Sequence, residues 1–215
     1  MKKQPSRPID NDALKAREAA GLWSAIALSR KLAEDREPIS LENLKRIHTV
    51  LLETSYPEAA GRFRQHGEDV KKLACIEPPP GVIVNQRIYE VWRDFEERLA
   101  EIPFVTPTDE GKLEEKLDVI FDLATWVQYQ IAAIHPFCEG NGRMARLVTN
   151  MVLLRFGLPP SRVKFEGENK SQYLSALCQV DRHGDYAPLR DIVIRGSLET
   201  LEKEEKRRLE AMQAS

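Results

Sequence analysis

The sequence of 215 residues lacks the features that mark several classes of protein. No apolar run approaches the length of a membrane span, and residues 1–11 are basic and polar with no apolar core behind them, so neither a membrane protein nor a secretory signal is expected. Lysine and arginine number 32 against 34 aspartates and glutamates, which excludes a polybasic field for nucleic acid or anionic membrane.

Cysteine is also scarce. Cys75, Cys138 and Cys178 are odd in number and scattered, so we expect reduced thiols in a cytoplasmic protein rather than a disulfide framework. The same composition would suit an effector exported by a dedicated secretion machine.

Strand patterns are nearly absent, and helical spacing of apolar residues dominates. The only strand-like stretch is residues 70–83, which a run of three prolines and a glycine interrupts. Ser40 is a candidate N-cap. The spacing predicts helices over 13–33, from 41 to about 51, over 84–100, from 110 to 134, over 143–156, up to 183 and from 188 onward. The chain is therefore expected to form a single all-α domain with one small β element.

The stretch His135–Arg146 reads H-P-F-C-E-G-N-G-R-M-A-R and concentrates polar chemistry between two predicted helices. Pro136 disfavours helical dihedrals at His135, so the imidazole is expected at a helix end. Residues 140–142, Gly-Asn-Gly, tolerate positive φ and can turn their amides inward as a nest for an anion. The nest and the free amides of the next helix together predict a phosphate site.

Charged side chains around this nest add to the same interpretation. Arg143 and Arg146 are three residues apart and can reach one set of phosphates from the first helical turn. Glu139 is a lone carboxylate beside these cationic groups, and it would suit a divalent cation such as Mg²⁺. His135 can exchange a proton near neutral pH. The pattern thus favours phosphoryl or nucleotidyl transfer with His135 as general base.

The stretch His135–Arg146 resembles the signature of the Fic family, H-x-F-x-D/E-G-N-G-R-x-x-R. Two further segments, Ala60–Arg64 (A-G-R-F-R) and the one around Tyr173 (Y-L-S-A-L), resemble other segments of the family. The resemblance implies a compact all-α core with a β-hairpin flap. It also implies a protein adenylyltransferase, which transfers AMP from ATP to a Ser, Thr or Tyr hydroxyl of a target protein.

The resemblance assigns a role to each matching residue. It makes His135 the catalytic base, Glu139 the Mg²⁺ ligand and Phe137 an anchor of the loop. The nucleotide would be bound by Gly140, Asn141, Gly142, Arg143, Arg146 and Tyr173. The target chain would add a strand to the flap at 70–83. The corresponding domain division is a tail and helix over 1–37, a catalytic domain over 38–195 and a charged helix over 196–215.

Several alternatives stay open at this stage. A member of the family could use UMP, GMP, phosphocholine or phosphate as donor, could remove AMP, or could bind nucleotide without turnover. Cys138 lies near a helix N-terminus but at a position that the signature leaves free. Regulation could come from an inhibitory segment, with Ser6 and Asp10 as its weakened form, or from an antitoxin-like inhibitor or self-association.

Overall fold

The computed structural model describes residues 11–104, 113–163 and 166–213, and its regular elements within these ranges are all helices. They are α1 (Asn11–Glu34), α2 (Leu41–Leu52), α3 (Gly81–Glu101), α4 (Leu113–Ile134), α5 (Asn141–Arg155), α6 (Gly167–His183) and α7 (Ala187–Gln213). The predicted all-α class is therefore confirmed for the described part of the chain.

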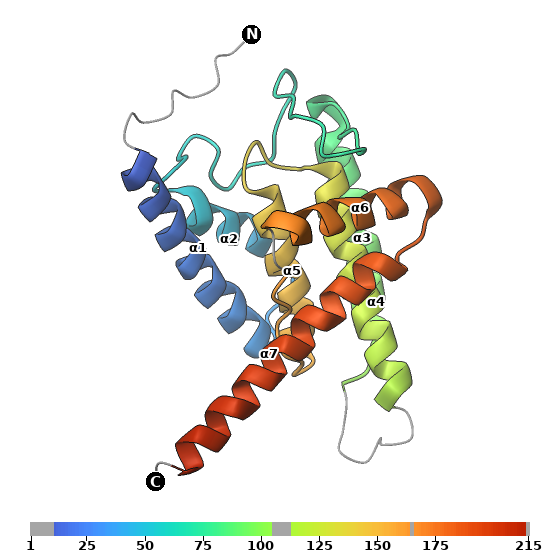
Figure 1. The fold of residues 1–215 in the computed structure, drawn as a ribbon. Coiled ribbons are helices and arrows are strands. Elements are labelled where there is room, and N and C mark those ends of the chain that lie inside the picture. The colour runs from blue at the N-terminus through green and yellow to red at the C-terminus, as the bar shows by residue number, and fades with distance from the viewer. Residues whose placement is uncertain (1–10, 105–112, 164–165, 214–215) are drawn as a thin grey trace.

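Helix α5 lies at the centre of the fold, packed against α1 and α4 (Figure 1). Met144, Val148, Met151 and Val152 of this helix are each at most 1% exposed. A helix with apolar residues nearly all round has to be enclosed by other elements. The core thereby fixes the N-terminal end of α5, which directly follows the loop at 135–140.

Two predicted helix ends beside this loop are confirmed. Helix α4 ends at Ile134, immediately before His135 and Pro136. Helix α2 begins with Ser40 as its N-cap, and the Ser40 hydroxyl accepts a hydrogen bond from the Asn43 amide at 3.2 Å.

The predicted β-hairpin at 70–83 is not formed. In the described chain this segment contains one isolated antiparallel bridge, in which Leu73 and Ile76 exchange two main-chain hydrogen bonds of 3.1 and 2.9 Å. Pro78, Pro79 and Pro80 have no amide hydrogen and cannot extend the second arm. Residues 81–83 already belong to α3, so the flap is a loop that ends at residue 80.

The expectation of three reduced thiols is wrong for two of them. Cys75 in the flap and Cys178 in α6 form a disulfide, with 5.8 Å between their Cα atoms, whereas Cys138 is free. The paired cysteines are 103 residues apart in the chain, and they meet only because the flap folds onto α6. Their spacing in the sequence therefore carried no signal of the pairing.

The charged C-terminal segment is part of a longer helix. Helix α7 runs without a break from Ala187 to Gln213. Its buried residues end at Thr200, and its C-terminal end extends away from the other helices (Figure 1). Among the described helices, none has both the length and the apolar character required to cross a membrane.

The crossing of α1 and α2 depends on Gly21. A Cβ atom at this position would lie 2.4 Å from the carbonyl oxygen of Leu51, which belongs to the backbone and cannot move aside alone. We expect Gly21→Ala to lower the free energy of unfolding by about 2 kcal/mol or more, even though alanine is the better helix former by about 1 kcal/mol. Denaturant titration measures the change.

Ala20→Gly is the matched control, because Ala20 is an exposed neighbour in the same helix. It should cost about 1 kcal/mol through helix propensity alone. A Gly21→Ala variant as stable as the wild type would contradict the packing described here.

Candidate functional site

The candidate site is the loop at 135–140 together with the first turn of α5. The end of α4 and the start of α5 meet here, so the negative pole of one helix and the positive pole of the other lie at the two ends of one short loop. The contacts that shape this loop come from α2 and from the 61–64 segment, which also binds the flap at Pro79.

His135 is held in a conformation that leaves one ring nitrogen available. Its φ of 49° is in the left-handed region, which is uncommon for a residue other than glycine. Nδ1 lies 2.6 Å from the carbonyl oxygen of Ala132, so Nδ1 carries the proton and donates it in a hydrogen bond. Burial lowers the pKa of His135, and the nearby charge of Arg64 lowers this pKa further. The imidazole is therefore neutral at pH 7, with Nε2 able to accept a proton.

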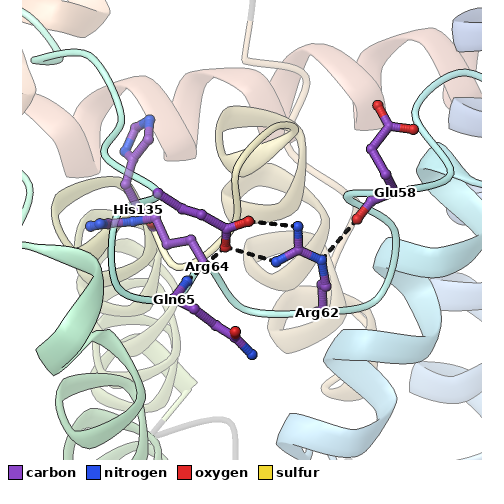
Figure 2. Close-up of polar contacts among 6 residues, drawn as sticks. Glu58, Arg62, Arg64, Gln65 and His135 are labelled. Atoms are coloured by element: carbon purple, nitrogen blue, oxygen red, sulfur yellow. Dashed lines mark hydrogen bonds and ion pairs between the residues drawn. The ribbon is translucent and has the colours of Figure 1, made fainter. Parts of the chain in front are cut away.

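Arg64 fixes the main chain at His135. Its side chain is fully buried, and its guanidinium donates to the carbonyl oxygens of His135 at 2.6 Å and Ile134 at 3.1 Å. It also donates to the carbonyl of Pro79, at the end of the flap. The Arg64 amide donates to the Pro136 carbonyl at 2.8 Å. Figure 2 shows Arg64 beside His135, and one side chain thus joins the loop, the end of α4 and the flap.

A second arginine shapes the approach to the flap. Arg62 makes two hydrogen bonds of 2.8 Å to the carboxylate of Glu68 and a third to the carbonyl of Glu58 (Figure 2). The hydrogen bond from Arg62 holds the pKa of Glu68 at about 2. Cys138 lies close to this pair, and burial raises the pKa of its thiol. The Cys138 thiol is protonated at neutral pH, which does not favour a nucleophilic role.

His48 of α2 supports the middle of the loop. It is fully buried and accepts a hydrogen bond at Nδ1 from the Gly61 amide, 3.0 Å away. Nε2 therefore carries the proton and donates to the Glu139 carbonyl at 2.9 Å. The His48 ring stacks on Phe137 with 3.6 Å between ring centroids. Burial lowers the pKa of His48 to about 4, which keeps the ring neutral.

Asn141 closes the loop onto the start of α5. Its side-chain oxygen accepts from the Phe137 amide at 2.9 Å, and its side-chain nitrogen donates to the Phe137 carbonyl at 2.7 Å. The predicted anion nest is shaped by Gly140, whose φ is 79°. A Cβ atom there would also lie 3.4 Å from Nε2 of His48. The side chain of Asn141 is thus used within the loop, and its main-chain amide begins the helix.

The two predicted arginines lie near the start of α5, Arg143 in its first turn and Arg146 in its second. A Cβ atom at Gly142 would be 3.6 Å from Nη1 of Arg146, so this guanidinium lies alongside the helix start. Arg143 makes an ion pair with Glu18 of α1 at 3.6 Å. Together with the free amides of the first turn, they make this end of α5 suited to an anion.

Tyr173 lies on the inner side of this site. It is 3% exposed and its hydroxyl accepts from Nε2 of Gln128 at 3.1 Å. Burial lowers the pKa of Arg146, and the nearby Tyr173 hydroxyl opposes this shift. The ring faces the core in this structure, so a nucleotide-binding role for Tyr173 stays a prediction.

The remaining predicted site residues are Glu139, Ser6 and Asp10. The side chain of Glu139 is exposed while its carbonyl is held by His48, so the carboxylate is available to a ligand. Within the described ranges, no group of three His, Cys, Asp or Glu side chains forms a metal site. Ser6 and Asp10 lie outside the described residues.

Three residues that shape the site were not identified from the sequence: the buried His48, Glu18, and Arg64, which was noted only as part of a motif. His48 lies four residues after Leu44 and three before Leu51, so helical spacing indicated a buried position but no role. Arg64 ends the A-G-R-F-R segment, which gave no role either, and nothing in the local sequence distinguishes Glu18 from a surface residue.

Comparisons with known proteins bear on the whole chain. The sequence model of the Fic/DOC family matches residues 38–153, more than half of the chain. The chain is 27% identical over 192 residues to a protein adenylyltransferase Fic of Nematostella vectensis; the match covers 88% of this chain and 40% of that protein. The chain therefore spans less than half the length of that curated relative.

Two solved structures are similar as well. Fic-1 of Caenorhabditis elegans superposes with a TM-score of 0.65 and 25% identity, covering 99% of this chain and 55% of that one. A Fic-domain signalling protein of Bacteroides thetaiotaomicron superposes with a TM-score of 0.71 and 20% identity, covering 91% of this chain and 73% of that one. The second likeness concerns the fold alone.

The neutral state of His48 predicts how stability depends on pH. Its pKa is lowered from 6.5 to about 4 in the folded protein, so the unfolded chain binds the proton more readily. The contribution of His48 to stability is complete above pH 6.5 and is lost as the pH falls from 6.5 to about 4, by about 3 kcal/mol. Denaturant unfolding at several pH values in this range measures the unfolding free energy, which should change less steeply with pH in His48→Asn than in the wild type.

His66→Asn is the control, because His66 is exposed. This variant should keep the wild-type slope. Equal slopes for the wild type and His48→Asn would contradict the assignment of the pH effect to His48.

The contacts of Arg64 predict a large structural effect. Arg64→Met keeps the apolar stem but leaves the carbonyls of Ile134, His135 and Pro79 without their donor, so we expect a loss of about 3 kcal/mol or more in unfolding free energy. Arg62→Met removes an ion pair that is partly exposed and should cost about 1 kcal/mol or less. Equal losses in thermal or denaturant unfolding would show that Arg64 has no special role.

Proposed function

Because this chain belongs to the Fic/DOC family, we propose that it is a protein adenylyltransferase, which transfers AMP from ATP to a hydroxyl side chain of a target protein. The activity is the one for which its sequence relative is named. The observation that carries the proposal is the state of His135. This histidine is neutral, and its Nδ1 donates a hydrogen bond to the Ala132 carbonyl. Its Nε2 can therefore accept a proton, beside the N-terminus of α5.

The reaction needs a base at the target hydroxyl. Nε2 of His135 takes the hydroxyl proton as the oxygen forms a bond to the α-phosphorus of ATP. The bond between the α-phosphorus and the oxygen that bridges to the β-phosphorus breaks, and pyrophosphate leaves with both electrons of that bond. The lowered pKa of His135 suits this step, because the imidazole is already deprotonated at neutral pH.

The start of α5 would hold the triphosphate. The amides of residues 140–142 and the guanidinium of Arg143 would stabilise charge on the α- and β-phosphates, and Arg146 would bind the γ-phosphate. In the present structure Arg143 is paired with Glu18, so a bound phosphate would share or replace that carboxylate.

Glu139 is the residue proposed to hold Mg²⁺. Its exposed carboxylate stands beside the anion site on a main chain that His48 fixes, and a nucleotide-bound Mg²⁺ typically takes one or two carboxylates from the protein. When bound, the ion would neutralise charge on the phosphates.

The target chain is proposed to dock on the flap by backbone pairing. Residues 70–77 are the part that can do so, because the prolines at 78–80 lack amide hydrogens and residues 81–83 are helical. The flap is fastened at Cys75 by the disulfide and at Pro79 by Arg64. These two attachments would hold a docked hydroxyl at a constant distance from His135.

Transfer of label from ATP tests the proposal. The full chain is incubated with Mg²⁺ and ATP labelled at either the α- or the γ-phosphate, with lysate proteins as targets. Label is expected on protein from the α position only, and His135→Ala should lower the rate by about a hundredfold or more. Arg146→Ala should raise the KM for ATP, because it removes a contact to the phosphates.

Circular dichroism of His135→Ala and Arg146→Ala is the control for folding. Transfer of the γ-label would instead indicate a kinase, and transfer that survives in His135→Ala would refute the role of the base. Absence of transfer from both positions, with the wild type folded, would leave another donor, an inhibitory segment or nucleotide binding without turnover, and a panel of nucleotides tested on Asp10→Ala separates these three.

A further inference from the structure

The exposed half of α7, residues 198–213, has no role in the proposed site. Helix α7 contacts α4 and α6, and its last buried residue is Thr200. Beyond that residue the helix extends away from the other helices (Figure 1). At about 1.5 Å per residue this half is about 24 Å long.

Large apolar side chains are exposed on this half. They are Leu198, Leu201, Leu209 and Met212, with exposed fractions of 51%, 40%, 60% and 77%. At about 100° per residue all four lie within about 80° of one another around the helix axis. A stripe of this kind on a helix in solvent is the pattern of a helix that pairs with another helix.

The charges on this half are separated along its length. Residues 199–205 contain four glutamates and one lysine, a net charge of −3, whereas residues 206–213 contain Lys206, Arg207, Arg208 and one glutamate, a net charge of +2. A second copy of the same helix would meet like charge if it ran parallel and opposite charge if it ran antiparallel. The charges therefore select a second copy of this chain in antiparallel orientation.

In one antiparallel register, an apolar pair and a charged pair of this face are formed at the same time. Glu205 and Arg208 lie on the same face as the apolar residues, between Leu201 and Leu209 in the chain. When Glu205 lies opposite Arg208 of the second copy, Leu201 lies opposite Met212 of that copy. The two-fold symmetry produces each of these pairs twice.

We propose that this chain forms an antiparallel homodimer through the exposed half of α7. The inference does not depend on the proposed enzymatic activity. Two helical segments of about 24 Å bury less than the roughly 1,600 Å² of a standard interface, so the dimer is weak, with a dissociation constant in about the micromolar range or above.

Analytical ultracentrifugation of the full chain, from about 1 μM to 1 mM, tests the proposal. The wild type is expected to show a reversible monomer–dimer equilibrium. Leu201→Glu should weaken the dimer by about tenfold or more, because it places a charge in the apolar seam. All the altered side chains are exposed, so circular dichroism should show unchanged folding.

Charge exchange tests the register. Glu205→Arg and Arg208→Glu should each weaken the dimer about tenfold, because each makes two contacts between like charges, and the double variant should return to within about threefold of the wild type. Lys203→Glu is the control for net charge, since Lys203 lies on the opposite face of the helix.

Each contrary outcome overturns the proposal. A monomer at every concentration would show that the stripe does not pair with itself. A dimer that is insensitive to Leu201→Glu would use another face of the molecule. Single charge variants as strong as the wild type, or a double variant that stays weak, would exclude this antiparallel register.

Discussion

The site depends on the burial of one cation, Arg64, at the end of α4. The last carbonyls of a helix lack partners within it and carry the negative end of its dipole. Arg64 supplies donors to the carbonyls of Ile134 and His135, although it comes from a segment about 70 residues earlier. These charge-assisted bonds offset part of the cost of burying the guanidinium. The negative pole at the loop is thereby satisfied by the protein itself, while the positive pole at α5 is left for a ligand.

Neutral histidines complete this arrangement. A charged His48 could not accept from the Gly61 amide, and a charged His135 could not accept a proton, so both rings work only in the deprotonated form. Both ring nitrogens of His48 have main-chain partners, whereas in His135 only Nδ1 is bound by one, and these contacts fix the tautomer of each ring. Burial, the largest cause of both lowered pKa values, thus keeps neutral both the histidine that supports the loop and the one proposed as the base.

The sequence was sufficient where a local pattern decides the structure. The apolar residues all round α5 predicted a buried central helix, and His135-Pro136 predicted the end of α4. The sequence was insufficient where contacts between distant segments decide the structure. The role of Arg64, the ion pair of Glu18 with Arg143 and the disulfide of Cys75 with Cys178 each join elements that the chain separates widely. The prediction of a hairpin was wrong for a local reason that is visible in the sequence, because three successive prolines cannot extend a strand.

The supporting contacts reach the loop through its main chain. Arg64 binds the carbonyls of Ile134 and His135, His48 binds the carbonyl of Glu139, and Asn141 binds the amide and carbonyl of Phe137. Fixation of the backbone places His135 and Glu139 without using Nε2 of one or the carboxylate of the other. The two side chains proposed for chemistry thus carry little of the structural role in this loop. The division explains how a loop of six residues can be both rigid in its path and open in its functional groups.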